Sequence, residues 1–360
     1  MSFEETRARF PVCDRIAYLN AGTYGPLSRG TAAAMVAAHE TALADGRSGG
    51  WEQMGALREQ VRDDIATLLS VAPSTVAVTA STSEGCAIVM RGLRLAPEDE
   101  VVTTDVEHVG LVAALGASGA RIRVAPLRGR PAAGAVDAIL AEVTPRTRLL
   151  ALSHVSWATG QVIDVHALRE QSGLPILVDG AQSAGAIAVD AHGLDFYTVS
   201  CQKWLCAPDP TGALVVADPE RLAVTSPTYF GIASFEADGS FALKPGAVRF
   251  DTVTHSLPTL AGLAHAAREA PPWRFEHATG AADRCRERLL AAGLDVVTEP
   301  GQATLVTFRA AGGDAPGAAA RAAEQGVVIR SLPGTDWLRA SCGYWTSDED
   351  LDRLVAAFRP

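Results

Sequence analysis

The sequence predicts an α/β protein in which a mostly parallel β-sheet is covered by helices and followed by a smaller α+β domain. Between about residues 76 and 216, short β-branched apolar runs alternate with segments of helical periodicity. Alternation at this spacing favours parallel strands joined by helical crossovers. A chain of 360 residues with 48% hydrophobic content can form two domains. We expect a large domain over 15–258 and a small one from 1–14 and 259–360.

The first third of the chain contains two strand-to-helix units. Residues 15–30 give a short apolar stretch and a Gly-rich turn before the helical, Ala-rich 31–70. A β-branched strand then leads to the hydroxyl cluster of residues 81–83 and an apolar helix. Such a cluster at a helix start suits a phosphate group, although the same pattern is an ordinary helix cap. Both readings remain open at this point.

The next unit, 99–127, reads as strand, turn, helix and strand, with His108 at the carboxyl end of the first strand. A histidine there is either a hydrogen-bonded structural group or a ring that stacks on a planar cofactor. Another strand and a helix follow before the apolar run ILVD. No GxGxxG follows a strand, so a dinucleotide-binding fold has no support.

The last third is less regular. Residues 219–258 are rich in Gly, Pro and Thr with isolated aromatics, which indicates loops and short strands near the active site. Residues 259–292 form an Ala/Leu/Arg-rich helical region, and 294–360 contain two β-runs, helices and a final strand, LRASCGYW. This pattern predicts the small α+β domain.

Composition excludes several classes of function. A net charge of −10 and a pI near 5.3 argue against a nucleic-acid or anionic-membrane surface. No 18-residue apolar span and no secretion signal are visible, so we expect a cytoplasmic protein. The six cysteines include no CxxC pair and no zinc-finger spacing, which predicts reduced, mostly buried thiols and no metal site.

One stretch carries the strongest chemical signal. The run ILVD ends on Asp179, a second apolar run ends on Asp195, and FYTVSCQKW then places Lys203 just past a third β-like segment. A carboxylate and an amine at the ends of neighbouring strands would face one crevice. Only two of the 31 basic residues are lysines, Lys203 and Lys244, and arginine cannot form an imine. These features suit pyridoxal phosphate (PLP), which needs a Schiff-base lysine and a carboxylate for its pyridinium nitrogen.

The sequence from about residue 15 to the end resembles fold-type I PLP enzymes of the class V aminotransferase superfamily. The motifs SHVSWATGQ, DGAQS, QKWLCAP, VRFDTVTHS and LRASCGYW are most similar to those of L-cysteine/cystine carbon-sulfur lyases. Isopenicillin N epimerase-like proteins and cysteine desulfurases are more distant relatives. The resemblance implies a PLP-binding large domain with a sheet of the seven-stranded type.

The resemblance also implies roles for individual residues. Lys203 would bind the PLP aldehyde, Asp179 would pair with the pyridinium and His108 would stack on the ring; these are the three expected catalytic residues. Further expected cofactor contacts are Gln182 at the ring hydroxyl and, at the phosphate, Thr82, Ser83, Ser200, Gln202 and, from the other subunit of a homodimer, Thr254. The expected substrate-binding residues are Arg339, which would hold the substrate carboxylate, with Asn20, Gly22 and Trp157.

Three departures from the superfamily pattern bear on the reaction. Gln202 stands where a histidine usually precedes the lysine, and an amide can donate to phosphate but stays neutral. The loop SLPGTDW lacks the nucleophilic cysteine of desulfurases, and Cys342 lies in a β-like run that reads as core. Trp157 replaces a desulfurase asparagine. Gln202 would change phosphate affinity or lysine basicity, the missing cysteine leaves no group there to receive sulfur, and Trp157 favours the lyase branch.

We therefore expect β-elimination on L-cysteine, cystine or a cysteine S-conjugate, which gives a thiol, pyruvate and ammonia. The same site would also serve transamination, epimerisation, or decarboxylation coupled to oxidative deamination of an S-conjugated amino acid. A third reading is a PLP-fold protein that binds a partner without catalysis. Retention of Lys203, Asp179 and Arg339 argues against that reading, because a non-catalytic binder does not need all three.

Overall fold

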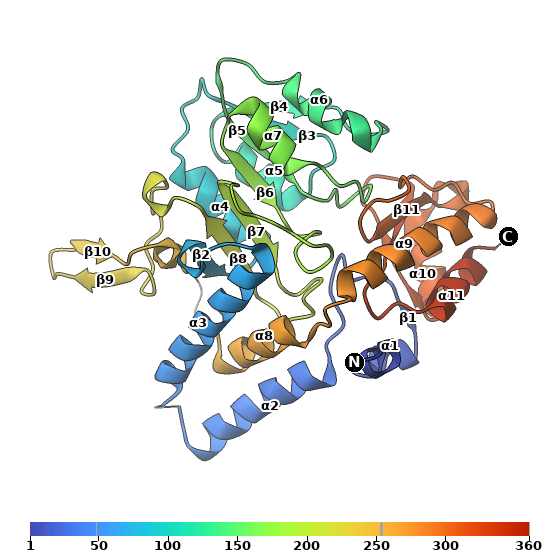
Figure 1. Cartoon of the computed structure of the whole chain (residues 1–360), viewed down its shortest axis with the longest axis horizontal. Helices are drawn as coiled ribbons and strands as arrows, with labels where there is room; N and C mark the ends of the chain where they lie inside the picture. The colour runs from blue at the N-terminus through green and yellow to red at the C-terminus, as the bar shows by residue number, and fades with distance from the viewer. Residues whose placement is uncertain (48, 253–254, 360) are drawn as a thin grey trace.

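A computed structural model describes residues 1–47, 49–252 and 255–359. At its centre lies a seven-stranded sheet with the order β2-β8-β7-β6-β5-β3-β4 (Figure 1). Its strands are β2 (Val76–Thr79), β3 (Glu100–Thr104), β4 (Arg121–Ala125), β5 (Thr147–Ser153), β6 (Ile176–Asp179), β7 (Phe196–Ser200) and β8 (Gly212–Val216). Strand β8 is antiparallel to both of its neighbours, and the remaining pairs are parallel. The predicted mostly parallel sheet is confirmed.

Helices cover both faces of this sheet. They are α3 (Gly50–Leu69), α4 (Thr82–Gly92), α5 (Val109–Gly116), α6 (Ala135–Leu140) and α7 (Val165–Ser172). Residues of α4 and α5 share one apolar cluster with the sheet, and residues of α3, α6 and α7 share the cluster on the opposite face. Because helices cover both faces, the central strands are buried at almost every position rather than at alternate ones.

The C-terminal part forms a second apolar core around a three-stranded antiparallel sheet of order β11-β14-β13. A two-stranded parallel pair, β1 with β12, joins the N-terminal region to this part. Its elements are α1 (Phe3–Arg7), β1 (Ala17–Tyr18), α9 (Arg274–Ala291), β11 (Leu305–Arg309), α10 (Ala315–Glu324), β12 (Val327–Val328), β13 (Arg330–Ser331), β14 (Trp337–Ser341) and α11 (Asp348–Phe358).

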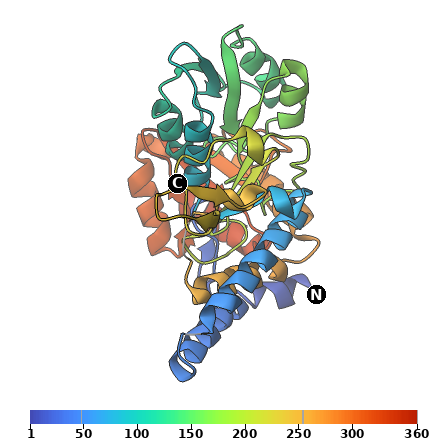
Figure 2. The same ribbon diagram turned by 90° about the vertical axis from the view of Figure 1, so that its left-hand side faces the viewer.

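Two further features extend from the large sheet. Helix α2 (Arg29–Ala44) packs on α8 (Leu257–Glu269), and both α2 and α3 reach away from the sheet (Figure 2). The hairpin of β9 (Ile232–Phe235) and β10 (Phe241–Leu243) projects at the left of Figure 1, on the same side as α3. The Gly/Pro/Thr-rich region therefore contains short strands, as predicted. Neither strand of the hairpin contributes a described residue to the cavity at the strand ends.

The segment between β6 and β7 differs from the sequence-based expectation. Residues 181–195 form turns rather than a second β-like run, and backbone hydrogen bonds from Ala184 to Gly180 and from Ala186 to Ser183 close them. The chain turns immediately after β6 because Gly180 packs against the ring of Tyr197, where a Cβ would lie 2.2 Å from a ring carbon. Because of this turn, β6 ends at Asp179. The chain then continues through residues 181–195 to β7 and Lys203.

The six cysteines form no disulfide bonds. All six cysteines are free and buried, which confirms the prediction of unpaired thiols. No helix within the described part of the chain is long and apolar enough to cross a membrane.

Candidate active site

The ends of β6 and β7 bring the predicted carboxylate and amine to one edge of the sheet. The two strands are adjacent and parallel, with Asp179 paired in register with Thr198. Asp179 is the last residue of β6, and Lys203 follows the end of β7 by three residues. Parallel strands direct the residues beyond their carboxyl ends into a shared crevice, as the sequence predicts.

A cavity of about 200 Å³ lies at this edge. Ten of the predicted site residues line it, which are Gly22, Thr82, Ser83, His108, Trp157, Gln182, Ser200, Gln202, Lys203 and Arg339. Asp179 and Asn20 are not in the lining, and the predicted Thr254 lies outside the described residues. The sequence thus predicts most of the lining but not four further members, Thr23, Tyr24, Ser81 and Arg330.

Asp179 is buried next to the cavity and held by its own turn. Its Oδ1 accepts the backbone N–H of Ala181 at 2.9 Å, and the side chain is 4% exposed. Its negative charge favours protonated Lys203, but burial outweighs this effect and lowers the pKa of the Lys203 amine to about 8. Arg339 and Arg330 lower that pKa further by charge repulsion. A lysine of this kind is neutral, and so nucleophilic, in a larger fraction near neutral pH than an exposed one.

The hydroxyl groups predicted to bind phosphate form a compact group at the start of α4. Ser81 caps the helix and accepts the backbone N–H of Glu84, which leaves Thr82 and Ser83 in the first turn. The hydroxyls of Thr82 and Ser200 lie 3.1 Å apart. The positive end of the helix dipole and these hydroxyls together suit an anion.

His108 is the N-cap of α5, and its ring orientation is set locally. Its Nδ1 accepts the backbone N–H of Gly110 at 3.1 Å, and its ring meets Trp157 edge-on at 5.1 Å between centroids. Burial and the nearby Lys203 charge lower the pKa of the imidazole. The ring is therefore neutral near pH 7, with Nδ1 as acceptor.

Gln182 and Asn20 both make hydrogen bonds within the protein. Gln182 Nε2 donates to the backbone oxygen of Gly22 at 2.9 Å, and its Oε1 accepts the indole N–H of Trp204 at 3.0 Å. This leaves one amide hydrogen of Gln182 for a ligand in the cavity. Asn20 Oδ1 accepts the hydroxyl of Thr23 at 2.8 Å, so the asparagine fixes the turn behind the lining rather than facing the cavity.

Two arginines from adjacent strands face the cavity. Arg339 of β14 is 1% exposed and pairs in register with Arg330 of β13. Arg339 donates to the backbone oxygen of Trp157 at 2.8 Å, while its Nε has no partner among the described residues. Burial and Arg330 lower the pKa of Arg339 to about 9. The guanidinium of Arg339 packs closely against the backbone of Gly22, because a Cβ at that position would lie 2.7 Å from Arg339 Nη2.

The family profile described as "Aminotransferase class-V" matches residues 37–354. The chain belongs to the class V aminotransferase family. Its members bind PLP, so this chain is a PLP-dependent enzyme of the branch that contains cysteine desulfurases and carbon-sulfur lyases. The predicted family, fold type and cofactor are thereby confirmed.

Relatives within the class V family agree over almost the whole chain. Isopenicillin N epimerase of Streptomyces clavuligerus is 28% identical, over 99% of this chain and 97% of its own length. Cysteine desulfurase CsdA of Escherichia coli (strain K12) is 27% identical, over 85% of this chain and 83% of its own. A solved complex of the cystine C-S lyase C-DES with cysteine persulfide superposes with a TM-score of 0.87 at 27% identity, covering 98% of this chain and 100% of that chain.

The class V site has the groups that PLP requires. Lys203 offers an amine for the aldehyde, Asp179 Oδ2 is free of hydrogen-bond partners among the described residues, and the start of α4 offers hydroxyls for the phosphate. Three buried polar atoms of lining residues also lack partners in the described part of the chain, namely Trp157 Nε1, Gln202 Oε1 and Arg339 Nε. Native proteins rarely leave such atoms unpaired, and the assignment of amide O and N in Gln202 is interchangeable. The residues therefore fit a polar, anionic ligand.

Proposed function

We propose that this enzyme is a carbon-sulfur lyase that eliminates a thiol from L-cysteine, cystine or a cysteine S-conjugate. The observation that carries the proposal is that Lys203 and Arg339 line a cavity with the Asp179 carboxylate buried beside it, while no thiol of a described residue lines that cavity. None of the six cysteines is more than 3% exposed, and no described lining residue is a cysteine. A desulfurase that passes sulfur to its own cysteine needs an accessible thiolate, whereas an elimination releases the sulfur as the leaving group.

When bound, PLP supplies an aldehyde that captures an amino group and an electron-withdrawing ring that stabilises negative charge at the substrate α-carbon. Lys203 Nζ accepts the α-proton, because desolvation makes its neutral form accessible near pH 8. Asp179 carries the negative charge that holds a proton on the ring nitrogen. The carbon-sulfur bond then breaks, and substrate plus one water gives a thiol, pyruvate and ammonia.

The two cavity arginines support an anionic amino-acid substrate. Arg339 presents a rigid, buried fork for the substrate carboxylate, and its Nε is free of partners within the described residues. Arg330 has one long contact, 3.5 Å to the hydroxyl of Thr23, and no acidic partner there. A second anionic group on the sulfur substituent, such as the second carboxylate of cystine, would meet this charge. Gln202 would donate to the phosphate together with Thr82, Ser83 and Ser200.

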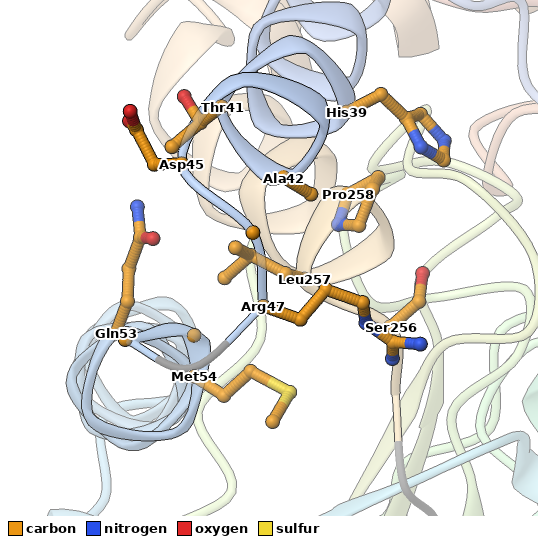
Figure 3. Close-up of a pocket in the computed structure, with 13 residues that line it drawn as sticks. His39, Thr41, Ala42, Asp45, Arg47, Gln53, Met54, Ser256, Leu257 and Pro258 are labelled. Carbon is orange, nitrogen blue, oxygen red and sulfur yellow. The ribbon is translucent and has the colours of Figure 1, made fainter.

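The proposed enzyme acts as a homodimer in which Thr254 of the partner subunit completes the phosphate site. A hollow of about 730 Å³ supports this, because the end of α2, the start of α3 and Ser256 at the start of α8 surround it (Figure 3). Helix α2, which contributes to its lining, also carries two exposed apolar side chains outside that lining: Leu43 is 86% exposed and Val36 54%. Large exposed apolar surfaces typically mark protein interfaces.

Product analysis of lysine variants tests the proposal. With an S-substituted cysteine, the PLP-loaded enzyme should release thiol, pyruvate and ammonia in equal amounts. With cystine, cysteine persulfide should take the place of the thiol, because the sulfur-sulfur bond stays in the leaving group. Lys203→Ala should abolish turnover and the visible absorbance of lysine-bound PLP. Lys244→Ala is the matched control, since it removes the only other lysine, and it should leave both unchanged. A product that keeps its carbon-sulfur bond would exclude elimination for that substrate.

Epimerisation is the second candidate, because the isopenicillin N epimerase of Streptomyces clavuligerus matches the chain from end to end. The same removal of the α-proton by Lys203 would serve, followed by its return to the opposite face. Chiral chromatography separates the two reactions. A D-amino acid with sulfur intact supports epimerisation, and free thiol with pyruvate supports elimination.

A further inference from the structure

Glu107 is a buried acid next to the site that the proposed reaction does not use. The residue is 9% exposed and its carboxyl accepts three hydrogen bonds. Thr104 Oγ1 donates to Oε1 at 2.6 Å, and the backbone N–H and hydroxyl of Ser153 donate to Oε2 at 3.0 and 2.5 Å. Acids are almost never fully buried unless they are paired, so three converging donors indicate a specific task.

These hydrogen bonds connect the ends of β3 and β5 beyond the point at which the backbone pairing of the two strands stops. The ladder between β3 and β5 ends at Val102 and Leu150, although the strands continue to Thr104 and Ser153. Beyond that point, the backbone N–H of Ser153 donates to Glu107 instead of to β3. The carboxyl group therefore braces the separated strand ends at the edge where the site lies.

The brace lies between two residues of the candidate site. On one side, Ser153 pairs in register with Asp179, and the backbone N–H of His154 donates to the Asp179 backbone oxygen at 3.0 Å. On the other side, His108 follows Glu107 directly, so fixing the Glu107 side chain fixes the backbone from which the imidazole projects. The remaining restraints on that ring are Gly110 and Trp157.

We propose that Glu107 is a positioning residue, which holds the His108 ring over the cofactor by tying the turn between β3 and α5 to the end of β5. The inference rests on the proposed role of His108 as the stacking residue. Burial raises the pKa of Glu107 to about 7, a cost that an apolar residue would avoid. A polar side chain of this reach can bond to groups of both strands, which an apolar side chain cannot do.

The first experiment compares Glu107→Leu with Glu107→Gln in the full-length protein. Leucine leaves the donors of Thr104 and Ser153 without acceptors, so the turn should shift. PLP affinity of the apo-protein, measured by quenching of tryptophan fluorescence, should fall about 10-fold or more, which is about 1.4 kcal/mol. The induced circular dichroism of bound PLP, which reports ring orientation, should weaken. Glutamine keeps one acceptor for Ser153 and offers an amide to the Thr104 hydroxyl, so it should restore both signals.

Glu100, the first residue of β3, supplies the matched control, since Glu107 follows the other end of that strand. It is 2% exposed and accepts the hydroxyl of Thr144 at 2.6 Å and Arg146 Nε at 2.8 Å. Glu100→Leu should lower the melting temperature but leave PLP affinity and circular dichroism unchanged. If it changes these signals as much as Glu107→Leu does, loss of a buried acid is sufficient and the positioning role is wrong.

A double-mutant cycle with His108→Ala decides whether Glu107 acts through the histidine. Once the ring is absent, Glu107→Leu should change PLP affinity less than about 2-fold. An equal loss in both backgrounds, or no loss in either, would overturn the inference. If Glu107→Leu does not fold, Thr104→Val carries the same cycle. It removes the hydrogen bond to Glu107 and the long one, 3.4 Å, that Thr104 accepts from the backbone N–H of Val106. The cycle measures PLP binding and needs no turnover. A result that contradicts the role of Glu107 therefore does not affect the lyase proposal. Likewise, the cycle can still be interpreted if the enzyme releases no thiol.

Discussion

Two pairs of neighbouring arginines differ in one respect of their surroundings. Arg58, Arg62 and Arg339 are buried, and Arg330 is half-buried. Arg58 and Arg62, four residues apart on α3, converge on Asp251. Arg62 Nη2 lies 3.0 Å and Arg58 Nη1 3.3 Å from its Oδ2, while Oδ1 accepts the backbone N–H of Val78 at 2.8 Å. Asp251 is 2% exposed, so the charges are enclosed together with their counter-ion.

Arg330 and Arg339 are also adjacent, but the structure gives them no carboxylate among the described residues. Their contacts are the hydroxyl of Thr23 and the backbone oxygen of Trp157. Two neighbouring positive charges without a counter-ion repel each other, and this repulsion adds to burial in lowering the pKa of Arg339. A fold tolerates this arrangement where a ligand supplies the missing charge. The comparison indicates a stabilising role for the α3 pair and supports the proposed role of the cavity pair in substrate binding.

The largest expected effect breaks the structural pair. Asp251→Asn keeps the acceptor for Val78 but removes the counter-charge of two buried guanidinium groups, so the free energy of unfolding should fall by about 3 to 5 kcal/mol. Denaturant unfolding measures this change. Asp336→Asn is the control, because its pair with Arg309 is well exposed and should contribute less than about 1 kcal/mol. Equal losses in the two variants would contradict the structural role of the Asp251 network.

A smaller effect is expected from the cavity pair. Arg330→Gln should leave the free energy of unfolding unchanged or raise it, since it removes a charge that no described carboxylate compensates. For a substrate with a second carboxylate, kcat/KM should fall about 10-fold, or about 1.4 kcal/mol. For a substrate with a neutral sulfur substituent, kcat/KM should change little. Steady-state kinetics with cystine and with an S-alkyl cysteine test this, and an equal loss for both would remove Arg330 from substrate selection.

The same comparison shows what the sequence can and cannot reveal. Asp179 and Lys203 can be predicted because each lies at or just after the end of a short buried strand. The near absence of lysine from the chain also draws attention to Lys203. Arg330 is not predictable, since its place beside Arg339 depends on the antiparallel register of β13 and β14. No local pattern encodes that register.

Glu107 and Asn20 show a second limit, the direction of a side chain in a loop. An acid between a strand and a helix reads as exposed, yet Glu107 turns inward because the strand ends separate and present unpaired donors. Asn20 lies in the predicted Gly-rich turn, but its side chain bonds to Thr23 instead of reaching the cavity. The resemblance identifies the segments, and only the fold shows which side chains point into the site.

The smallest expected effect concerns the amine that both cavity arginines influence. Burial, Arg339 and Arg330 lower the pKa of Lys203, so its neutral form should increase as the pH rises through about 8 rather than 10.5. Since only the neutral amine attacks an aldehyde, the rate at which apo-protein captures PLP should rise with the same midpoint. Stopped-flow absorbance between about pH 6 and pH 10 measures this rate. Arg330→Gln removes one repelling charge and should move the midpoint to higher pH, whereas Arg62→Gln on α3 should not. A wild-type midpoint near that of an exposed lysine would show that the cavity pair does not act on Lys203.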